Sequence, residues 1–295
     1  MLLNRTAHRI GYLGSMKSWD QKKVDSLNQF LDYLILHLNY NSNRGIRVFC
    51  VDSQDIDFEK IDFSQIEEDS LEQEKIDIIF NFLSFNKSRL FFFISKSYFL
   101  GSQIPEVVDQ TKGILSKISS FLDLVGFQEP SILVRVGSAY GNRKETLSRF
   151  CSEVESLPES ISSRLIVVND EKPSLFSVTD LLAGVFYTTK TPICFRFLPH
   201  QFNDGGLTSR EALFLSSSTW PVGVKPLFIY SEAESTDDLG FPVSPTPSEY
   251  LGFRIPTFNL EIDVVLDSGG KDLTCTKYMQ ENKSLKPIVI NRAPE

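Results

Sequence analysis

Histidine and cysteine are scarce in this sequence, so the side chains that most metal and redox sites use are in short supply. The 295 residues include three histidines and four cysteines, and these form no CxxC or HxxxH pair. Such pairs are the usual sequence sign of zinc sites and redox dithiols. The cysteines are too scattered for a disulfide framework, which indicates a reducing compartment. Serine, threonine and cysteine residues lack a candidate base, so nucleophilic catalysis has no support.

Long apolar runs and an excess of basic charge are also missing. The richest apolar stretch, residues 90–94, is far shorter than the ~18 residues that a membrane span needs, and the first 14 residues contain no signal-peptide core. Acidic residues outnumber basic ones by 38 to 30, and a net charge of −8 does not attract a phosphate backbone. We therefore expect a soluble intracellular protein, in the cytoplasm or an organelle interior, without membrane insertion. DNA binding stays a less favoured alternative.

The sequence is rich in phenylalanine and in alternating strand and helix patterns. Its 24 phenylalanines predict a core built largely from phenyl rings. Short apolar runs alternate with helical patterns, which is typical of βα units around a parallel sheet. The expected strands are 10–13, 46–51, 89–93, 132–136, 165–168, 192–197, 227–230 and 262–266, and the expected helices are 20–38, 76–85, 105–124, 143–155 and 177–186.

Eight strands is the number that a closed (β/α)8 barrel needs, and about 250 residues is the usual length of that fold. The first βα turn also lacks the glycine-rich pattern of a doubly wound sheet. We therefore predict the α/β class and a single (β/α)8 TIM barrel over residues 1–283. An extended C-terminal tail is expected over residues 284–295.

Short segments in a fixed order carry a family resemblance. They are 9–12, 38–41 and 45–49 near the start, and 139–143, 157–160, 164–165, 169–172 and 178–182 in the middle of the chain. In order and spacing they resemble the metal-dependent UV-damage endonucleases, from residue 9 to about residue 270. The resemblance implies a (β/α)8 barrel that nicks DNA beside photolesions.

The same resemblance implies three metal ions, held by histidines and carboxylates at the carboxyl ends of the strands. Such ions would generate hydroxide, orient the phosphate and stabilise the leaving oxygen. In this sequence the corresponding positions are Phe93, Arg135, Val168, Arg196, Pro199, Leu227, Ile229, Pro247 and Asp267. Only Asp267 keeps a ligand chemistry, because apolar side chains cannot coordinate Mn²⁺ or Zn²⁺ and arginines repel them. We therefore predict a degenerate member of the family, with no metal and no cofactor. We expect five of these side chains to point toward the mouth at the carboxyl ends of the strands: Phe93, Arg135, Val168, Arg196 and Ile229.

Three functions stay open at this point. We favour a catalytically inactive barrel that acts as a structural or protein-interaction subunit, with protein partners that the sequence does not identify. The first alternative is a DNA-repair endonuclease that nicks UV-damaged DNA with a rearranged site. The second alternative is a binder of anionic small ligands at Arg135 and Arg196, because paired guanidiniums bind carboxylate or phosphate groups in a bidentate manner. We expect these arginines to form internal salt bridges with Asp170 or Asp267, since an unpaired buried arginine is costly.

Four further features of the sequence carry expectations of their own. The cluster 170–172 at a strand end is predicted to shape its loop through hydrogen bonds. The acidic stretch 52–74 is predicted to be a solvated face, and His200 a lone surface histidine. The proline-rich stretch 232–247 is predicted to be a loop inserted late in the barrel. Its candidate contacts with a partner are Phe241, Pro242 and Pro245.

Overall fold

Eight short parallel strands form a closed barrel in the order of the sequence, with β8 paired to β1. The computed structural model describes residues 8–19, 23–139 and 141–282, so the predicted tail lies outside the described residues. Each strand falls within two residues of its predicted bounds, and the predicted (β/α)8 TIM barrel is confirmed. The strands are β1 (Ile10–Leu13), β2 (Val48–Asp52), β3 (Arg89–Phe93), β4 (Ile132–Val134), β5 (Leu165–Val168), β6 (Ile193–Arg196), β7 (Leu227–Tyr230) and β8 (Asp263–Leu266).

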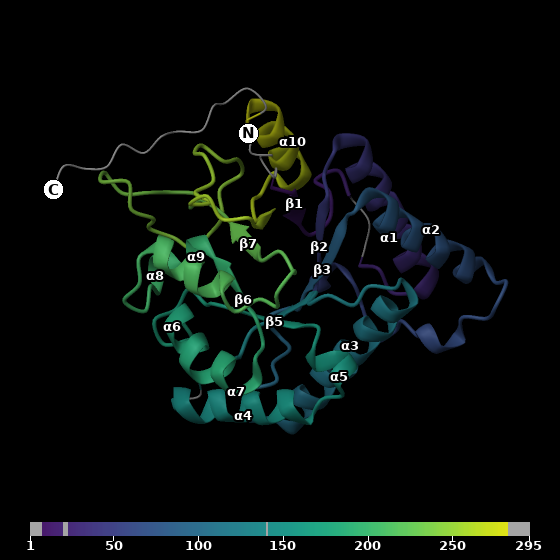
Figure 1. The fold of residues 1–295 in the computed structure, drawn as a ribbon, viewed down its shortest axis with the longest axis horizontal. Helices are drawn as coiled ribbons and strands as arrows, with labels where there is room; N and C mark the ends of the chain where they lie inside the picture. Colours follow the sequence, from purple (N-terminus) through teal and green to yellow (C-terminus); the bar gives the residue numbers. More distant parts are fainter. Residues whose placement is uncertain (1–7, 20–22, 140, 283–295) are drawn as a thin grey trace.

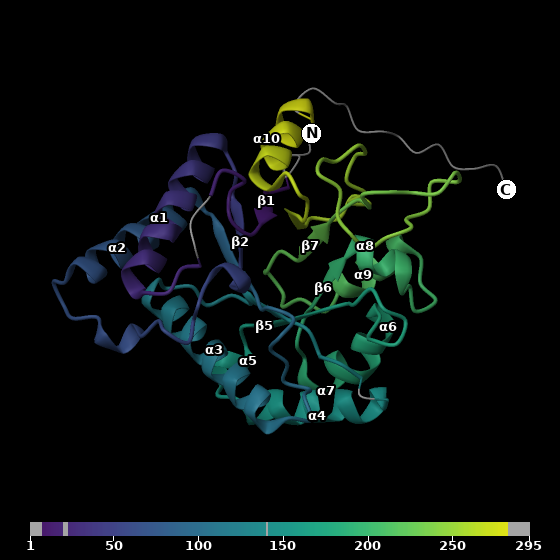
Figure 2. The same cartoon turned by 180° about the vertical axis from the view of Figure 1, so that it is seen from behind.

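Helices surround the barrel on the outside, as the two opposite views in Figure 1 and Figure 2 show. The helices are α1 (Leu27–Arg44), α2 (Leu71–Asn86), α3 (Pro105–Leu124), α4 (Arg143–Ser156), α5 (Glu159–Ser162), α6 (Val178–Leu181), α7 (Tyr187–Thr189), α8 (Phe197–Phe202), α9 (Ser209–Ser217) and α10 (Lys271–Asn282). The connection from β7 to β8, residues 231–262, is a long loop without a helix, which agrees with the insertion predicted there. None of the helices within the described residues has the length and apolar character of a membrane span.

The first helix begins and ends later than its sequence pattern predicts. We expected a helix over 20–38, but the hydroxyl of Ser26 caps the first turn of α1, which therefore begins at the next residue. The helix ends where Gly45 adopts a left-handed conformation with φ of 74°. Val24, which the helical pattern included, instead forms a β-bridge with Ile56.

The predicted helix 177–186 is divided into shorter pieces. Ser177 and Asp180 form the expected capping box at the start of α6. A π-helical turn then spans Leu182–Phe186, and α7 follows it. Gly184 allows this turn to lie close to α4, because a Cβ atom there would lie 2.7 Å from the Cδ1 atom of Leu147.

The acidic stretch 52–74 is only partly the solvated face that we expected. Its carboxylates are exposed or half-exposed, but the stretch also buries the apolar side chains of Ile56, Phe58, Ile61 and Phe63. The ring of Phe30 on α1 lies 4.9–5.8 Å from those of Phe58, Phe63 and Phe121, a range in which aromatic pairs attract each other. The stretch therefore joins α1 to α3 through a phenylalanine cluster, which confirms the predicted use of phenyl rings in the core.

The amino-terminal end of the barrel contains a buried charge network. Asp263 accepts hydrogen bonds from Arg9 and Arg89 at 2.7–3.1 Å. Arg89 also donates to the carbonyl of Lys225 at 2.6 Å, and its Nε atom lies 3.0 Å from the carboxylate of Glu129. Above this network the barrel interior is filled with apolar side chains. The opposite, carboxyl end is therefore the place where a ligand can enter.

Candidate functional site

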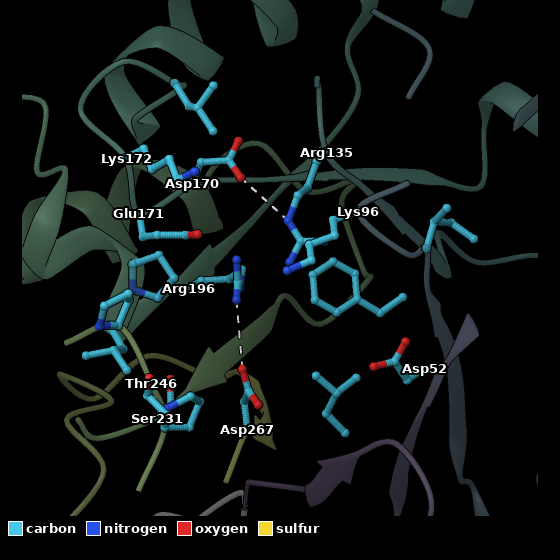
Figure 3. A pocket seen from close by; sticks show the side chains of 18 of the residues that line it. Asp52, Lys96, Arg135, Asp170, Glu171, Lys172, Arg196, Ser231, Thr246 and Asp267 are labelled. Atoms are coloured by element: carbon cyan, nitrogen blue, oxygen red, sulfur yellow. Dashed lines mark ion pairs between the residues drawn. The ribbon is translucent and has the colours of Figure 1, made fainter. Parts of the chain in front are cut away.

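A cavity of about 590 Å³ opens at the carboxyl ends of the strands. This is the end of a (β/α)8 barrel at which active sites are built. Four cations and four acids line it, so the cavity is rich in charge and close to neutral overall. These charged residues are Asp52, Lys96, Arg135, Asp170, Glu171, Lys172, Arg196 and Asp267, and they come from six of the eight strand ends (Figure 3).

Arg135 and Arg196 project into this cavity from the ends of β4 and β6. Both guanidiniums lie over the ring of Phe93, with centroid distances of 4.4 and 5.4 Å. The amide of Asn169 fixes the end of β6, because its Oδ1 atom accepts the Arg196 N–H at 2.7 Å and its Nδ2 atom donates to the Arg196 carbonyl at 3.1 Å. Phe93 is therefore an apolar platform that supports two like charges.

Each arginine has one carboxylate partner, as we expected from the sequence. The Nε atom of Arg135 lies 3.5 Å from an oxygen of Asp170, and the Nη2 atom of Arg196 lies 3.8 Å from an oxygen of Asp267. In Figure 3, Arg196 stands between Asp267 on one side and the Arg135–Asp170 pair on the other. Both separations are too long for good hydrogen bonds. The arginines are therefore neutralised by nearby charge but are not held by directed bonds.

Burial raises the pKa of three carboxyl groups in the cavity. The pKa of Asp170 rises to about 6, chiefly because of desolvation, although Arg135 and Arg196 oppose the rise. Burial also raises the pKa values of Asp52 and Asp267. The pKa of Arg135 falls to about 10, first because of burial and second because Arg196 carries the same charge. The cavity therefore gains positive charge as the pH falls through 6, when Asp170 becomes protonated.

The family described as UV-endonuclease UvdE matches residues 9–292 of the chain. The chain belongs to this family. The predicted resemblance is therefore confirmed, whereas the loss of catalytic activity stays a prediction.

Curated UV DNA damage endonucleases are similar to this chain at low identity. The UV DNA damage endonuclease of Bacillus anthracis (strain A0248) is 24% identical over 172 residues, which cover 57% of this chain and 53% of that protein. The chain therefore matches about half the length of that relative. The UV DNA damage endonuclease of Bacillus cereus (strain Q1) is 21% identical over 279 residues, which cover 93% of this chain and 87% of that protein.

Solved structures give the same result for the fold. The crystal structure of SacUVDE is 25% identical, with a TM-score of 0.76 over 95% of this chain and 100% of that chain. Endonuclease IV from Thermus thermophilus has a TM-score of 0.60 at 13% identity, over 92% of this chain and 98% of that chain, and shows a shared fold alone.

The side chains at the mouth do not fit the metal ions that the UV-damage endonuclease resemblance implies. Ions such as Mn²⁺ and Zn²⁺ need several carboxylate or imidazole groups around one point. Within the described part of the chain, no group of three or more histidine, cysteine, aspartate or glutamate side chains is placed to hold one. The carboxylates of Asp170 and Asp267 each face an arginine instead. This donor set therefore does not fit metal-assisted hydrolysis.

The nine positions that correspond to the implied metal ligands lie at two levels. Those that line the cavity are Phe93, Arg135, Arg196, Pro199, Pro247 and Asp267. Val168, Leu227 and Ile229 are buried in the apolar interior of the barrel instead. Our expectation that Val168 and Ile229 point to the mouth is therefore wrong. Inward-facing residues alternate along a strand, so Asp170 and Ser231, two residues further on, reach the mouth in their place.

His200 is not the surface histidine that we expected. Its side chain is buried against Phe195, with ring centroids 5.0 Å apart, and burial lowers its pKa. The prediction failed because it rested on the lack of partner residues in the sequence, although the neighbours Phe197, Leu198 and Phe202 are apolar and indicate a segment packed on the barrel. His200 is also absent from the residues that line the mouth cavity.

The sequence reasoning did not assign six polar residues to the cavity that line it in the structure: Asp52, Gln54, Lys96, Ser138, Ser231 and Thr246. Asp52 and Ser231 directly follow expected strands, and that position was the signal available for them. The residues that we predicted to contact a partner lie in different places. Pro245 lines the cavity, whereas Phe241 is 65% exposed on the surface.

Proposed function

We propose that this chain is a catalytically inactive UvdE-family barrel that serves as a structural or protein-interaction subunit. The observation that supports this best is the pair of guanidiniums, Arg135 and Arg196, at the mouth. Metal-assisted phosphodiester hydrolysis depends on a bound water whose pKa the metal lowers. A guanidinium supplies positive charge and N–H donors but cannot coordinate a water oxygen in this way. These positions therefore favour binding of an anion over its hydrolysis.

The loop 231–262 supports the interaction role. It exposes five large hydrophobic side chains: Leu239, Phe241, Val243, Tyr250 and Phe253. The turn that carries Phe241 is already formed, because the carboxylate of Asp237 accepts the N–H groups of Leu239 and Phe241 at 3.0 and 2.8 Å. A preformed turn loses less conformational entropy on docking, and aromatic anchors dominate interface energy.

One observation favours the alternative of a rearranged endonuclease. Asp170 has a pKa of about 6, which is suited to a general base near neutral pH, and two arginines beside it could stabilise a phosphorane-like charge. Under this alternative, nicking of UV-irradiated DNA would proceed without added metal and would be abolished by Asp170→Asn. If neither the wild type nor the Asp170→Asn variant nicks UV-irradiated DNA without added metal, this alternative is wrong.

Metal content tests the loss of the hydrolytic centre. We expect purified protein that is incubated with Mn²⁺ or Zn²⁺ and then gel-filtered to retain far less than one ion per chain. Asp267→Ala should not change that content, because Asp267 faces Arg196. Stoichiometric metal in the wild type that is lost in Asp267→Ala would contradict the proposal.

Quantitative mass spectrometry of interactors from the native source tests the interaction role. Phe241→Ser is expected to lose at least one specific interactor without a change in thermal stability, because the side chain is exposed. Phe85→Ser is a matched control, since Phe85 is 84% exposed at the far end of α2. If both variants retain every wild-type interactor at wild-type levels, the loop is not the interface.

A further inference from the structure

The two arginines at the mouth offer more hydrogen-bond donors than the chain satisfies. Within the described residues their guanidiniums have ion-pair partners at 3.5 and 3.8 Å but no hydrogen bond. The side chain of Arg196 is only 9% exposed, and its Nε and Nη1 atoms are buried without a partner. Buried donors are nearly always paired in folded proteins, and leaving one unpaired is costly. The arrangement therefore lacks an acceptor group.

We propose that the mouth cavity binds a small phosphomonoester that carries hydroxyl groups, with its phosphate held by Arg135 and Arg196. A phosphate group presents several acceptor oxygens in a geometry that guanidinium forks match. This inference goes beyond the proposed function, because ligand binding in the cavity does not depend on whether a partner docks on the loop 231–262.

The electrostatics of the arginine pair favour an anion beside it. Arg135 and Arg196 share the face of Phe93, and the charge of Arg196 helps to lower the pKa of Arg135. An anion in contact with both removes this repulsion. Lys96 and Lys172 line the same cavity and add positive charge; in Figure 3, Lys96 lies beside Arg135.

The other side of the cavity limits the ligand to one phosphate. Asp52 lies apart from the arginines in Figure 3, and Asp267 and Ser231 line the cavity below Arg196. One oxygen of Asp52 accepts the N–H of Gln54, which leaves the other free to accept a ligand hydroxyl. These carboxylates repel a second phosphate but suit hydroxyl groups.

Size and total charge favour a small molecule over a nucleic acid. The volume of about 590 Å³ lies within the ~300–1,000 Å³ of ordinary small-molecule sites. The chain carries a net charge of −8, which opposes the approach of a polyanion. A ligand with a single phosphate meets the local positive charge without that penalty.

Isothermal titration calorimetry with ribose 5-phosphate, ribose and inorganic phosphate tests the proposal. Ribose 5-phosphate is expected to bind one per chain, and more tightly than inorganic phosphate, whereas ribose should not bind at about 10 mM. Arg196→Met should weaken binding about 10- to 100-fold, because charged hydrogen bonds are lost. Arg210→Met, on the exposed surface of α9, is the matched control and should leave binding unchanged.

Two further variants keep the test decisive if Arg196→Met does not fold. Lys96 is exposed, so Lys96→Met should fold and should weaken binding of ribose 5-phosphate by several-fold. Arg196→Lys keeps the charge but loses the planar fork, and an intermediate affinity is expected.

The proposal is overturned by any of the following results. These are no binding of ribose 5-phosphate at about 10 mM, equal affinity for ribose and ribose 5-phosphate, and unchanged affinity in folded Arg196 and Lys96 variants. Tighter binding of an oligonucleotide without terminal phosphates would also overturn it, in favour of a nucleic-acid site. None of these results bears on interactor loss in Phe241→Ser, so the two proposals fail separately.

Discussion

Replacing Asp263 by asparagine is expected to destabilise the barrel strongly. The Asp263 side chain is fully buried and accepts four hydrogen bonds, three from Arg9 and one from Arg89. The Arg89 side chain is only 3% exposed. In Asp263→Asn its buried guanidinium therefore loses its buried carboxylate partner, and the partners that remain are the carbonyl of Lys225 and the half-exposed carboxylate of Glu129. Removing one partner of a buried ion pair typically costs about 3–5 kcal/mol. That loss is a large share of the ~5–15 kcal/mol by which most domains are stable.

Urea denaturation of the wild type and the variant measures this loss. The unfolding midpoint should fall while the slope of unfolding free energy against urea stays constant. Asp109→Asn, on the exposed face of α3, is the matched control and should change stability by less than about 0.5 kcal/mol. The double variant Asp263→Leu with Arg89→Met should recover much of the loss, because apolar replacements of a whole pair are often tolerated. A loss below about 1 kcal/mol in Asp263→Asn would refute the reasoning.

Three further predictions concern the core and the mouth. The folded pKa of Asp170, about 6, lies above its ordinary value of 3.8, so this carboxyl destabilises the fold increasingly as the pH rises from 3.8 to 6. The difference in unfolding free energy between Asp170→Asn and the wild type should therefore shift by about 3 kcal/mol in favour of the variant from pH 3.5 to pH 7. If the unfolding free energies of the two proteins change with pH in the same way, the prediction is wrong. Phe121→Ala should cost about 3–5 kcal/mol in chemical denaturation, because the ring is fully buried in the phenylalanine cluster. Gly11→Ala should prevent formation of the native barrel, as read by near-UV circular dichroism, since its Cβ atom would lie 1.8 Å from the carbonyl oxygen of Val48.

The barrel could be predicted from the sequence because each strand is a short apolar run bounded by polar residues. Burial on both sides of a parallel sheet requires that pattern, so the bounds of β3 and β7 were predicted without error. The start of α1 could not be predicted, because the cap at Ser26 and the β-bridge of Val24 compete with a helical pattern that continues through them. A side-chain cap and a tertiary β-bridge therefore decided that boundary.

The mouth was predicted in part. Arg135 and Arg196 and their acidic partners could be named, because residues at the carboxyl ends of barrel strands converge. The position of each side chain along the barrel axis could not be predicted. Val168 and Ile229 were therefore expected at the mouth, although they lie in the apolar interior below it. Residues two positions apart on a strand face the same side but lie at different heights in the barrel, and sequence similarity near 25% does not fix such details.

Incision of UV-irradiated plasmid DNA in the presence of Mn²⁺ tests the central claim most directly, because it asks whether the mouth can hold a hydrolytic metal centre. With Arg135 and Arg196 facing Asp170 and Asp267, we predict a nicked fraction equal to that of a protein-free control, with and without the metal. Nicking that requires both the lesion and Mn²⁺, and that disappears in Asp267→Ala, would contradict the account.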